Sequence, residues 1–334
     1  MAGLTRLRRY VRRFLAEQRD DAPAPQCSAV KEARYRQVIG IAAARYFIKH
    51  ERTPDLVIPF DEVKRANQVA LEDLPACIDA YLDRQELSEP EFAVFRHFTD
   101  PNETIIDVGA HFGYSAASMW RAGSRAYVLS IEPNPWNTMT LQRIKLLRPG
   151  RYDYLPVGVG NAPARLRFVT PVVEGMGIGG LCSAAIESEM DWDIPENLVR
   201  YMLQYTPDVA APRLQFAEAE WEVVPLDDLL RTRRPSVPLD RIAAIKLDVE
   251  GLEAPAIEGA TLTLEQHRPM LMVEHANRNR EVVDRLTQLG YRYAEFNDGT
   301  VYLTEQQSSR VSGFYLHATR LDDYRTTGLL VAAP

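Results

Sequence analysis

From Thr104 onward the sequence alternates short apolar runs with stretches of helical spacing. The first two runs are Thr104–Val108 and 126–131, and a helical stretch follows each of them. Strands that alternate with helices form βαβ units around a parallel sheet, whose buried strands are apolar on both faces. This pattern predicts an α/β fold with helices on both faces of a mostly parallel sheet. The other apolar runs are 152–159, Ile242–Leu247, 270–273 and 291–303, and the helical stretches are 113–122, 135–147, 253–266 and 279–289.

Composition narrows the class of protein. The 334 residues carry a net charge of −7, with 46% hydrophobic and 25% charged residues. These are ordinary globular values, and the acidic balance gives no support to a nucleic-acid binder. Three distant cysteines, Cys27, Cys77 and Cys182, favour neither a disulfide framework nor a zinc site. Because no long apolar run or signal peptide is present, we expect no transmembrane segment and a cytoplasmic location.

The first hundred residues follow a different pattern. Helical spacing recurs over 4–19, 31–50 and 61–84, and Ser88 is expected to cap a further helix that ends near residue 98. We therefore expect 1–98 to be a helical N-terminal extension that caps the sheet or builds a homodimer. Residues 99–334 would form the main domain. Its insertion at 170–221, rich in glycine and aromatic residues, is expected to be a lid or a structural subdomain.

A glycine-containing turn follows the first predicted strand. Asp107 lies near the strand end, and Gly109 and Gly113 bracket the turn into the next helix. Gly109 permits a sharp turn where a side chain would collide with a ligand, and the helix start supplies free N–H groups. This suits a carboxylate ligand, while Asp107 could hold an ammonium group, directly or through water, at ~1.5–3 kcal/mol. The Gly-x-x-x-Gly spacing disfavours a nicotinamide-dependent dehydrogenase.

Acidic residues end other predicted strands as well. Glu132 follows the strand 126–131, where doubly wound folds place an acid that accepts hydrogen bonds from ribose hydroxyls. Its alternative role is that of an acid at a helix start. Asp248 and Glu250 close the strand Ile242–Leu247, and Glu274 closes the next strand. Several carboxylates at one mouth would attract a cation or hold a divalent ion.

These blocks resemble the FkbM family of methyltransferases. The matching stretches are IIDVGAHFGYSA, IKLDVEGLEAPAIEGA (245–260) and PMLMVEH (269–275), and the family usually has Asn in place of His111. The resemblance covers roughly 90–303. It implies a class I methyltransferase fold, Rossmann-like with a seven-stranded sheet, and S-adenosylmethionine as cofactor. The cofactor contacts that it implies are Asp107, Gly109, Ala110, His111, Phe112, Gly113, Glu132, Pro133, Asn134, Val157, Gly158 and Asp248.

The resemblance also implies transfer of a methyl group to a hydroxyl of a sugar, polyketide or other natural product. A hydroxyl must lose its proton as it attacks, so we expect His275 or Asp248 to act as base, with Glu250 also facing the reaction centre. Alternatively, a metal such as magnesium, held by Asp248, Glu250 and Glu274, lowers the hydroxyl pKa. N-methylation of an amino sugar or peptide, and a non-catalytic scaffold, remain open alternatives.

Overall fold

The computed structural model describes residues 33–35, 37, 57–60, 86–177, 183–184, 199, 213–233, 235–274, 279–305 and 312–333. The chain divides into two compact units, one of residues 1–72 and 167–220 and one of residues 73–166 and 221–334. The expected helices 4–19 and 61–84 lie outside the described residues. Within 31–50, residues 33–35 and 37 are helical. The division at residue 98 and the lid at 170–221 stay predictions.

The first unit contains a small sheet. Strand β1 pairs in parallel with β9, and β7 and β8 pair with β6 in antiparallel fashion. An ion pair between Arg167 and Glu218, with a nitrogen–oxygen distance of 3.7 Å, adds to this unit. Apart from Val199, which is helical, the described part of the 170–221 segment therefore consists mainly of strands and the turn between β6 and β7. The strands are β1 (Val57–Pro59), β6 (Ala164–Val173), β7 (Met176–Gly177), β8 (Ser183–Ala184) and β9 (Leu214–Val224).

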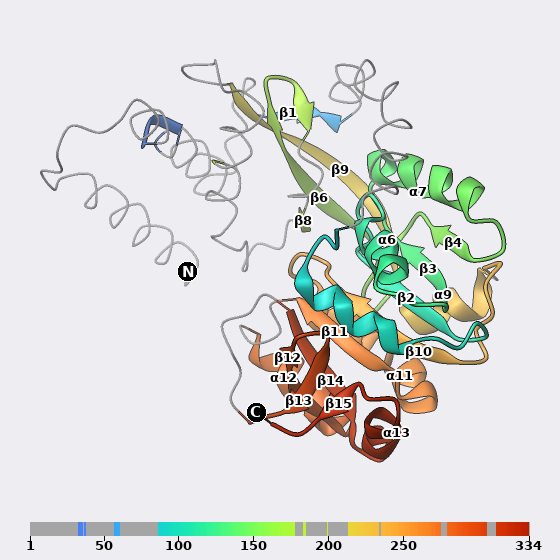
Figure 1. Cartoon of the computed structure of the whole chain (residues 1–334). Coiled ribbons are helices and arrows are strands. Elements are labelled where there is room, and N and C mark those ends of the chain that lie inside the picture. The colour runs from blue at the N-terminus through green and yellow to red at the C-terminus, as the bar shows by residue number, and fades with distance from the viewer. Residues whose placement is uncertain are drawn as a thin grey trace, which may run out of the picture. The chain divides into compact units, whose positions relative to one another are not determined.

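The second unit is built on a nine-stranded sheet of order β15-β13-β12-β14-β11-β10-β2-β3-β4 (Figure 1). The five strands from β11 to β4 are parallel, and β14 runs antiparallel beside β11. The sheet strands are β2 (Thr104–Val108), β3 (Tyr127–Ile131), β4 (Tyr152–Leu155), β10 (Ile242–Leu247), β11 (Met270–Glu274), β12 (Tyr291–Asn297), β13 (Thr300–Leu303), β14 (Ser312–His317) and β15 (Leu330–Val331); β5 (Gly158–Val159) pairs with β9 instead.

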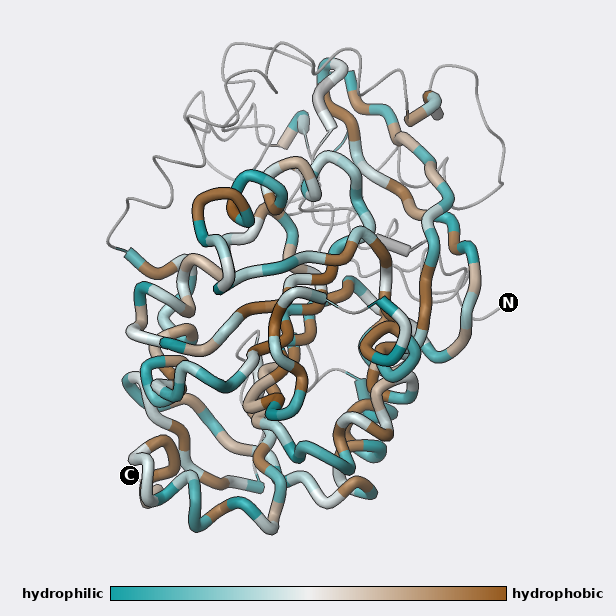
Figure 2. Tube along the Cα trace, turned by 90° about the vertical axis from the view of Figure 1, so that its right-hand side faces the viewer, coloured by the Kyte–Doolittle hydropathy of each residue, from teal (hydrophilic) through white to brown (hydrophobic). Residues whose placement is uncertain are grey.

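Helices pack on both faces of this sheet because alternate strand residues form two separate apolar cores. Ile105 and Met272 face one core with Phe95, whereas Ile106 and Leu247 face the other. In Figure 2 the central strands are largely apolar along their length. The helices are η1 (Pro90–His97), α6 (Tyr114–Arg121), α7 (Pro135–Leu147), α9 (Leu226–Thr232), α10 (Glu253–Glu258), α11 (Thr261–His267), α12 (Arg280–Gln288), η4 (Ala318–Arg320) and α13 (Leu321–Thr326).

Four local predictions were wrong. The run 152–159 is two strands, because β4 pairs with β3 and β5 leaves that sheet to pair with β9. The run 291–303 is not one strand, because Asp298 and Gly299 turn it into the hairpin of β12 and β13. The stretch 253–266 is two helices, which meet at Gly259, where a Cβ atom would lie 1.9 Å from the carbonyl oxygen of Gly160. Ser88 does not cap η1, since its hydroxyl bonds the Ser118 hydroxyl at 2.9 Å. The sheet consequently has more strands than the seven expected.

Candidate active site

The loop between β2 and α6 is shaped by two glycines. Gly109 has a φ of +76°, and a Cβ atom there would lie 1.6 Å from the carbonyl oxygen of Asp248. Gly113 has a φ of +84° at the N-cap of α6, and its Cβ would lie 2.3 Å from Cδ1 of Ile144 on α7. Gly109 is therefore required by close approach to another backbone segment, and Gly113 by its left-handed φ. Gly109 brings the loop against the end of β10.

His111 occupies the middle of this loop. Its φ of +48° is in the left-handed region, and its backbone N–H donates to Oε2 of Glu132 at 2.9 Å. The imidazole packs against Phe112 and Tyr114, with ring centroids 4.2 and 5.7 Å away. Burial disfavours the charged imidazolium and lowers the pKa of His111 to about 4. The neutral ring has a buried Nε2 with no hydrogen-bond partner among the described residues.

Glu132 follows β3 and links the loop to α7. Its Oε1 accepts the backbone N–H of Asn134 at 2.8 Å, while the Asn134 side chain caps α7 through the N–H of Trp136 at 3.0 Å. Glu132 is only 7% exposed. Burial raises its pKa to about 7, although hydrogen bonds from Asn134, Asn137 and His111 act in the opposite direction. The carboxylate is held at the carboxyl ends of β2 and β3, where the sequence placed it.

The region expected beside an adenine ring also comes together. A Cβ atom on Gly158 would lie 3.8 Å from Cβ of Pro133 and 2.9 Å from Cγ2 of Val223. Val157 is buried, at 3% exposure. Two buried amide atoms near Glu132, Nδ2 of Asn134 and Oδ1 of Asn137, have no hydrogen-bond partner among the described residues. They leave donor and acceptor capacity for a ligand in this part of the site.

Asp107 is completely buried and its carboxylate is held by protein groups. Oδ2 accepts hydrogen bonds from the hydroxyls of Ser115 at 2.5 Å and Ser130 at 3.3 Å. Oδ1 lies 3.7 Å from the ammonium nitrogen of Lys246. Burial raises the pKa of Asp107, while Lys246 and Ser115 oppose that rise. A ligand's ammonium would therefore meet Asp107 only across this network.

Sequence reasoning missed Lys246. It is one of five lysines in the chain and is the last but one residue of the buried strand β10. Burial alone would lower its pKa, but the carboxylates of Asp248 and Asp107 prevail and raise it, so the side chain remains cationic. A lysine between Ile245 and Leu247, in a strand expected to be apolar on both faces, was the signal that could have revealed it.

Three carboxylates converge beyond β10 and β11. One oxygen each of Asp248, Glu250 and Glu274 lies within 4.8 Å of the others. Burial raises the pKa of Glu274 strongly, whereas Lys246 and a hydrogen bond from Glu274 outweigh burial and lower the pKa of Asp248. The hydrogen bond from Glu274 to Asp248 couples the two carboxyls, and the opposite shifts of their pKa values favour a protonated Glu274 beside an ionised Asp248.

The turn that carries Glu250 is fixed locally. Glu250 and Gly251 have φ values of +50° and +98°. Oε1 of Glu253 accepts the backbone N–H groups of Val249 at 3.2 Å and Gly251 at 3.3 Å. Glu253 thus stabilises the turn that follows Asp248. The predicted base His275 lies outside the described residues.

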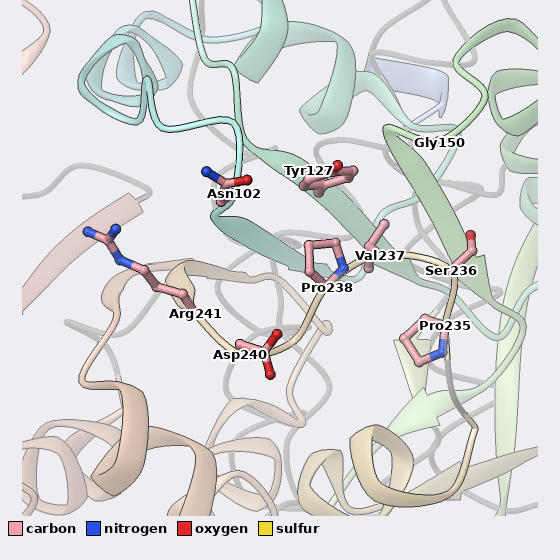
Figure 3. A pocket seen from close by; sticks show the side chains of 9 residues that line it. All are labelled: Asn102, Tyr127, Gly150, Pro235, Ser236, Val237, Pro238, Asp240 and Arg241. Atoms are coloured by element: carbon pink, nitrogen blue, oxygen red, sulfur yellow. The ribbon is translucent and has the colours of Figure 1, made fainter.

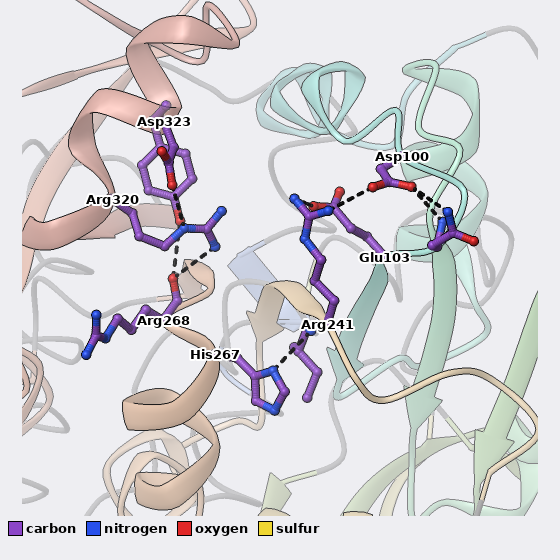
Figure 4. Close-up of polar contacts among 10 residues, drawn as sticks. Asp100, Glu103, Arg241, His267, Arg268, Arg320 and Asp323 are labelled. Carbon is purple, nitrogen blue, oxygen red and sulfur yellow. Dashed lines mark hydrogen bonds and ion pairs between the residues drawn. The ribbon is translucent and has the colours of Figure 1, made fainter.

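A cavity lies at the opposite end of the sheet from the glycine loop. Its volume is about 670 Å³, and it is lined by Asn102, Tyr127, Ser236 and Arg241, among others (Figure 3). Arg241 is already paired with Asp100 and Glu103, each at 2.8 Å (Figure 4). This cavity is at the amino ends of the strands, whereas open α/β sheets bind ligands beyond the carboxyl ends. The candidate site is therefore the end that carries the glycine loop.

The strand order, the antiparallel β14 and the glycine loop after β2 define the class I methyltransferase fold. The sequence matches the family model of the methyltransferase FkbM domain over residues 107–293, more than half of the chain. The chain therefore belongs to the FkbM methyltransferase family. No curated protein matches it. No helix within the described ranges is long and apolar enough to span a bilayer.

The chain is also remotely similar to solved structures. Methyltransferase FkbM from Methylobacillus flagellatus KT shares 18% identity at a TM-score of 0.38, covering 74% of this chain and 59% of that one. Fibrillarin from Aeropyrum pernix, in complex with natively bound S-adenosyl-L-methionine, shares 12% identity at a TM-score of 0.28, covering 64% of this chain and 66% of that one. An O-methyltransferase from Bacillus cereus in complex with SAH shares 10% identity at a TM-score of 0.26, covering 88% of this chain and 92% of that one. The chain thus spans 59% of the Methylobacillus protein's length.

Proposed function

We propose that the chain is an S-adenosylmethionine-dependent methyltransferase that methylates a hydroxyl of a small-molecule or glycosylated acceptor, such as a sugar or polyketide. The observation that carries this proposal is the arrangement of the glycine loop and Glu132 at adjacent strand ends, joined by the bond from His111. A buried carboxylate in that position can accept hydrogen bonds from both ribose hydroxyls. Membership in the FkbM methyltransferase family supports the reaction class.

The residues present fit this cofactor. The buried atoms Nδ2 of Asn134 and Oδ1 of Asn137 have open hydrogen-bonding capacity close to Glu132, as a nucleoside requires. The cluster of Asp248, Glu250 and Glu274 gives the neighbouring mouth negative character, which favours a cationic sulfonium. When bound, S-adenosylmethionine supplies an activated methyl group. The protein's part is to orient the acceptor in line with it, which can contribute up to about 7–11 kcal/mol.

The acceptor hydroxyl must also lose its proton. We propose Asp248 as the base, because its side chain is 30% exposed and Lys246 holds one of its oxygens. A divalent ion such as magnesium, bound by Asp248, Glu250 and Glu274, would instead lower the hydroxyl pKa. Chelation distinguishes the two routes. Turnover that survives chelation but is lost in Asp248→Asn identifies Asp248 as the base, whereas loss on chelation that magnesium restores identifies the ion.

His275 is the other base that the sequence suggested. Comparing His275→Ala with Asp248→Asn, after cofactor binding has been verified in both, separates their contributions. Near-normal turnover in both variants contradicts base catalysis by either residue. If the acceptor proves to be methylated on nitrogen, the chain is an N-methyltransferase instead. A tertiary amine or thioether acceptor would need no base, so normal turnover in both variants is also the result expected for such an acceptor.

The central test is calorimetric titration with S-adenosylmethionine, with NAD as a comparison. We expect micromolar binding of S-adenosylmethionine and none of NAD. Glu132→Gln should weaken the binding of S-adenosylmethionine, because an amide offers one acceptor oxygen where a carboxylate offers two. Glu103→Gln is the matched control, since Glu103 is equally buried at 7% exposure but precedes β2 at the other end of the strand. Binding of NAD alone would contradict the proposal in favour of a dehydrogenase, and binding of neither in favour of a scaffold.

A further inference from the structure

Lys246 is buried near the carboxyl end of the interior strand β10, where a charge is costly. Its register partners are Asp107 on β2 and Met272 on β11, and the residue is only 8% exposed. An unpaired ammonium at such a depth would lose several kcal/mol of solvation, in order of magnitude. The lysine must therefore be held by acceptors that the fold supplies.

Two hydrogen-bond acceptors and a third, more distant carboxylate surround the ammonium, and they belong to different parts of the site. Nζ of Lys246 donates to Oδ2 of Asp248 at 3.0 Å and to the carbonyl oxygen of Gly109 at 3.3 Å. It lies 3.7 Å from Oδ1 of Asp107. Gly109 belongs to the glycine loop and Asp248 to the mouth of the proposed reaction centre. One buried ammonium thus contacts the cofactor side and the acceptor side of the site at once.

We propose that Lys246 is a positioning residue that fixes the glycine loop and Asp248 relative to each other. The two parts meet closely, since a Cβ atom on Gly109 would touch the carbonyl oxygen of Asp248. That approach sets the backbones, but it does not itself fix the Asp248 carboxylate. The ammonium does so by holding Oδ2 of Asp248 and the Gly109 carbonyl together. The inference rests on the proposed function, because the loop is taken to be the cofactor site.

If Lys246 served stability alone, a variant that keeps the protein stable without it should also keep the cofactor affinity. Replacing a buried ion pair with neutral groups of similar volume is often harmless to stability, whereas removing one partner is costly. The variant Lys246→Met leaves Asp107 buried without its cation, so it can lose stability for that reason alone. The double variant Lys246→Met/Asp107→Asn removes both charges, and the amide oxygen that it introduces can still accept the bonds from Ser115 and Ser130. Its proper reference is the single variant Asp107→Asn.

The test compares these two variants in melting temperature, in S-adenosylmethionine affinity and in amide hydrogen exchange of residues 109–113. We expect similar melting temperatures, at least tenfold weaker binding in the double variant (about 1.4 kcal/mol), and faster exchange in the loop. A loop that is no longer held must be ordered on binding, and this weakens affinity. Lys145→Met is the control, because Lys145 also pairs with an aspartate, Asp153, but on α7. It should change neither the affinity nor the loop exchange.

Equal affinity and equal loop exchange in Lys246→Met/Asp107→Asn and Asp107→Asn would overturn the inference. Failure of the wild-type protein to bind S-adenosylmethionine would count against the proposed function, while loop exchange would still decide whether Lys246 holds the loop. Should the double variant not fold, Lys246→Arg keeps the cation and provides the second test. It should retain wild-type loop exchange, and faster exchange there would overturn the inference.

Discussion

The backbone N–H of His111 donates to the carboxylate of Glu132 at 2.9 Å, which joins the glycine loop to the end of the neighbouring strand. This bond couples the conformation of the loop to the ionisation of one buried acid. An ionised Glu132 holds the loop through the N–H and presents its remaining lone pairs to a ligand. The proposed ribose site and the loop are therefore parts of one hydrogen-bonded unit.

The raised pKa of Glu132, about 7, predicts a pH dependence of cofactor affinity. Ribose hydroxyls donate to the ionised carboxylate, so binding lowers this pKa and releases a proton. At pH 6 about a tenth of Glu132 is ionised and at pH 8 about nine-tenths, so affinity should rise about tenfold between them. Calorimetry in two buffers of different ionisation enthalpy measures the proton release. Glu132→Gln should show neither effect, and an equal pH dependence in that variant would contradict this assignment.

The raised pKa of Glu132 also predicts how the stability of the protein depends on pH. The folded-state pKa of Glu132 lies above the ordinary value of 4.5, so the unliganded protein binds this proton more tightly than the unfolded chain does. The contribution of Glu132 to stability is therefore present below pH 4.5 and lost as the pH rises to about 7. Urea unfolding of the wild type and Glu132→Gln at pH 5 and pH 8 checks the sign. The variant should gain stability relative to the wild type at the higher pH.

Gly109→Ala should damage the site far more than an ordinary glycine substitution. Its Cβ would lie 1.6 Å from a backbone oxygen of Asp248, which cannot rotate away, and its φ is +76°. Gly150→Ala is the matched control, with a φ of +71° and nothing within 4 Å of the added atom. The control carries only the cost of the left-handed backbone, about 1–2 kcal/mol. Thermal unfolding should show a clearly larger loss for Gly109→Ala, and equal losses would refute the close approach.

The order of elements through the first two βαβ units could be predicted from the sequence. The apolar run 104–108 coincides with β2, and the stretch 135–147 coincides with α7. Buried parallel strands and amphipathic helices can be recognised from a short stretch of sequence, because the spacing of their apolar residues reflects which side chains are buried. Once the strands were predicted, the acids at their ends could be grouped into one site, because the carboxyl ends of parallel strands meet at one edge of the sheet.

The parts that sequence reasoning missed depend on tertiary contacts. The antiparallel strand β14 was not predicted, although Phe314, Tyr315 and Leu316 are buried in it. The Asp298-Gly299 pair was a hairpin signal that the prediction overlooked. The partners of Lys246 are not encoded in its own segment, because Gly109 lies 137 residues away in sequence. Such contacts follow from the register of β10 against β2, which periodicity does not specify.

Asp153 is expected to be important for the stability of the sheet edge. Its Oδ2 accepts the backbone N–H of Ser236 at 2.6 Å, and its Oδ1 accepts the ammonium of Lys145 and the N–H of Tyr154. Asp153→Ala should cost about 1.5–3 kcal/mol, because it removes a buried, charged acceptor to which several donors bond. Asp322→Ala is the control. Its i,i+3 pair with Arg325 is solvent-exposed, and surface pairs of this kind contribute little. Urea unfolding midpoints compare the two, and equal midpoints would contradict the role of Asp153.

Asp153 also predicts acid sensitivity. Burial would raise its pKa, but the bonds from Lys145, Ser236 and Tyr154 prevail and lower it below 3.8. A carboxyl with a lowered folded pKa stabilises the protein above its unfolded pKa, and that stability is lost as the pH falls below 3.8 towards the folded pKa. The stability difference between the wild type and Asp153→Ala should therefore be constant near neutrality and shrink below pH 3.8. A difference that grows on acidification would contradict this sign.

His111→Asn should leave the loop intact. Asn is among the residues that tolerate a positive φ, and the backbone N–H to Glu132 is retained. The variant loses the ring contacts with Phe112 and Tyr114, so we expect a loss of stability of about 1 kcal/mol. Cofactor affinity should stay within about threefold, less than 1 kcal/mol. In contrast, His111→Pro removes the N–H and requires a negative φ, so it should abolish binding. If His111→Asn lost binding as completely as His111→Pro, the imidazole itself, through its buried Nε2, would be the group that contacts the ligand.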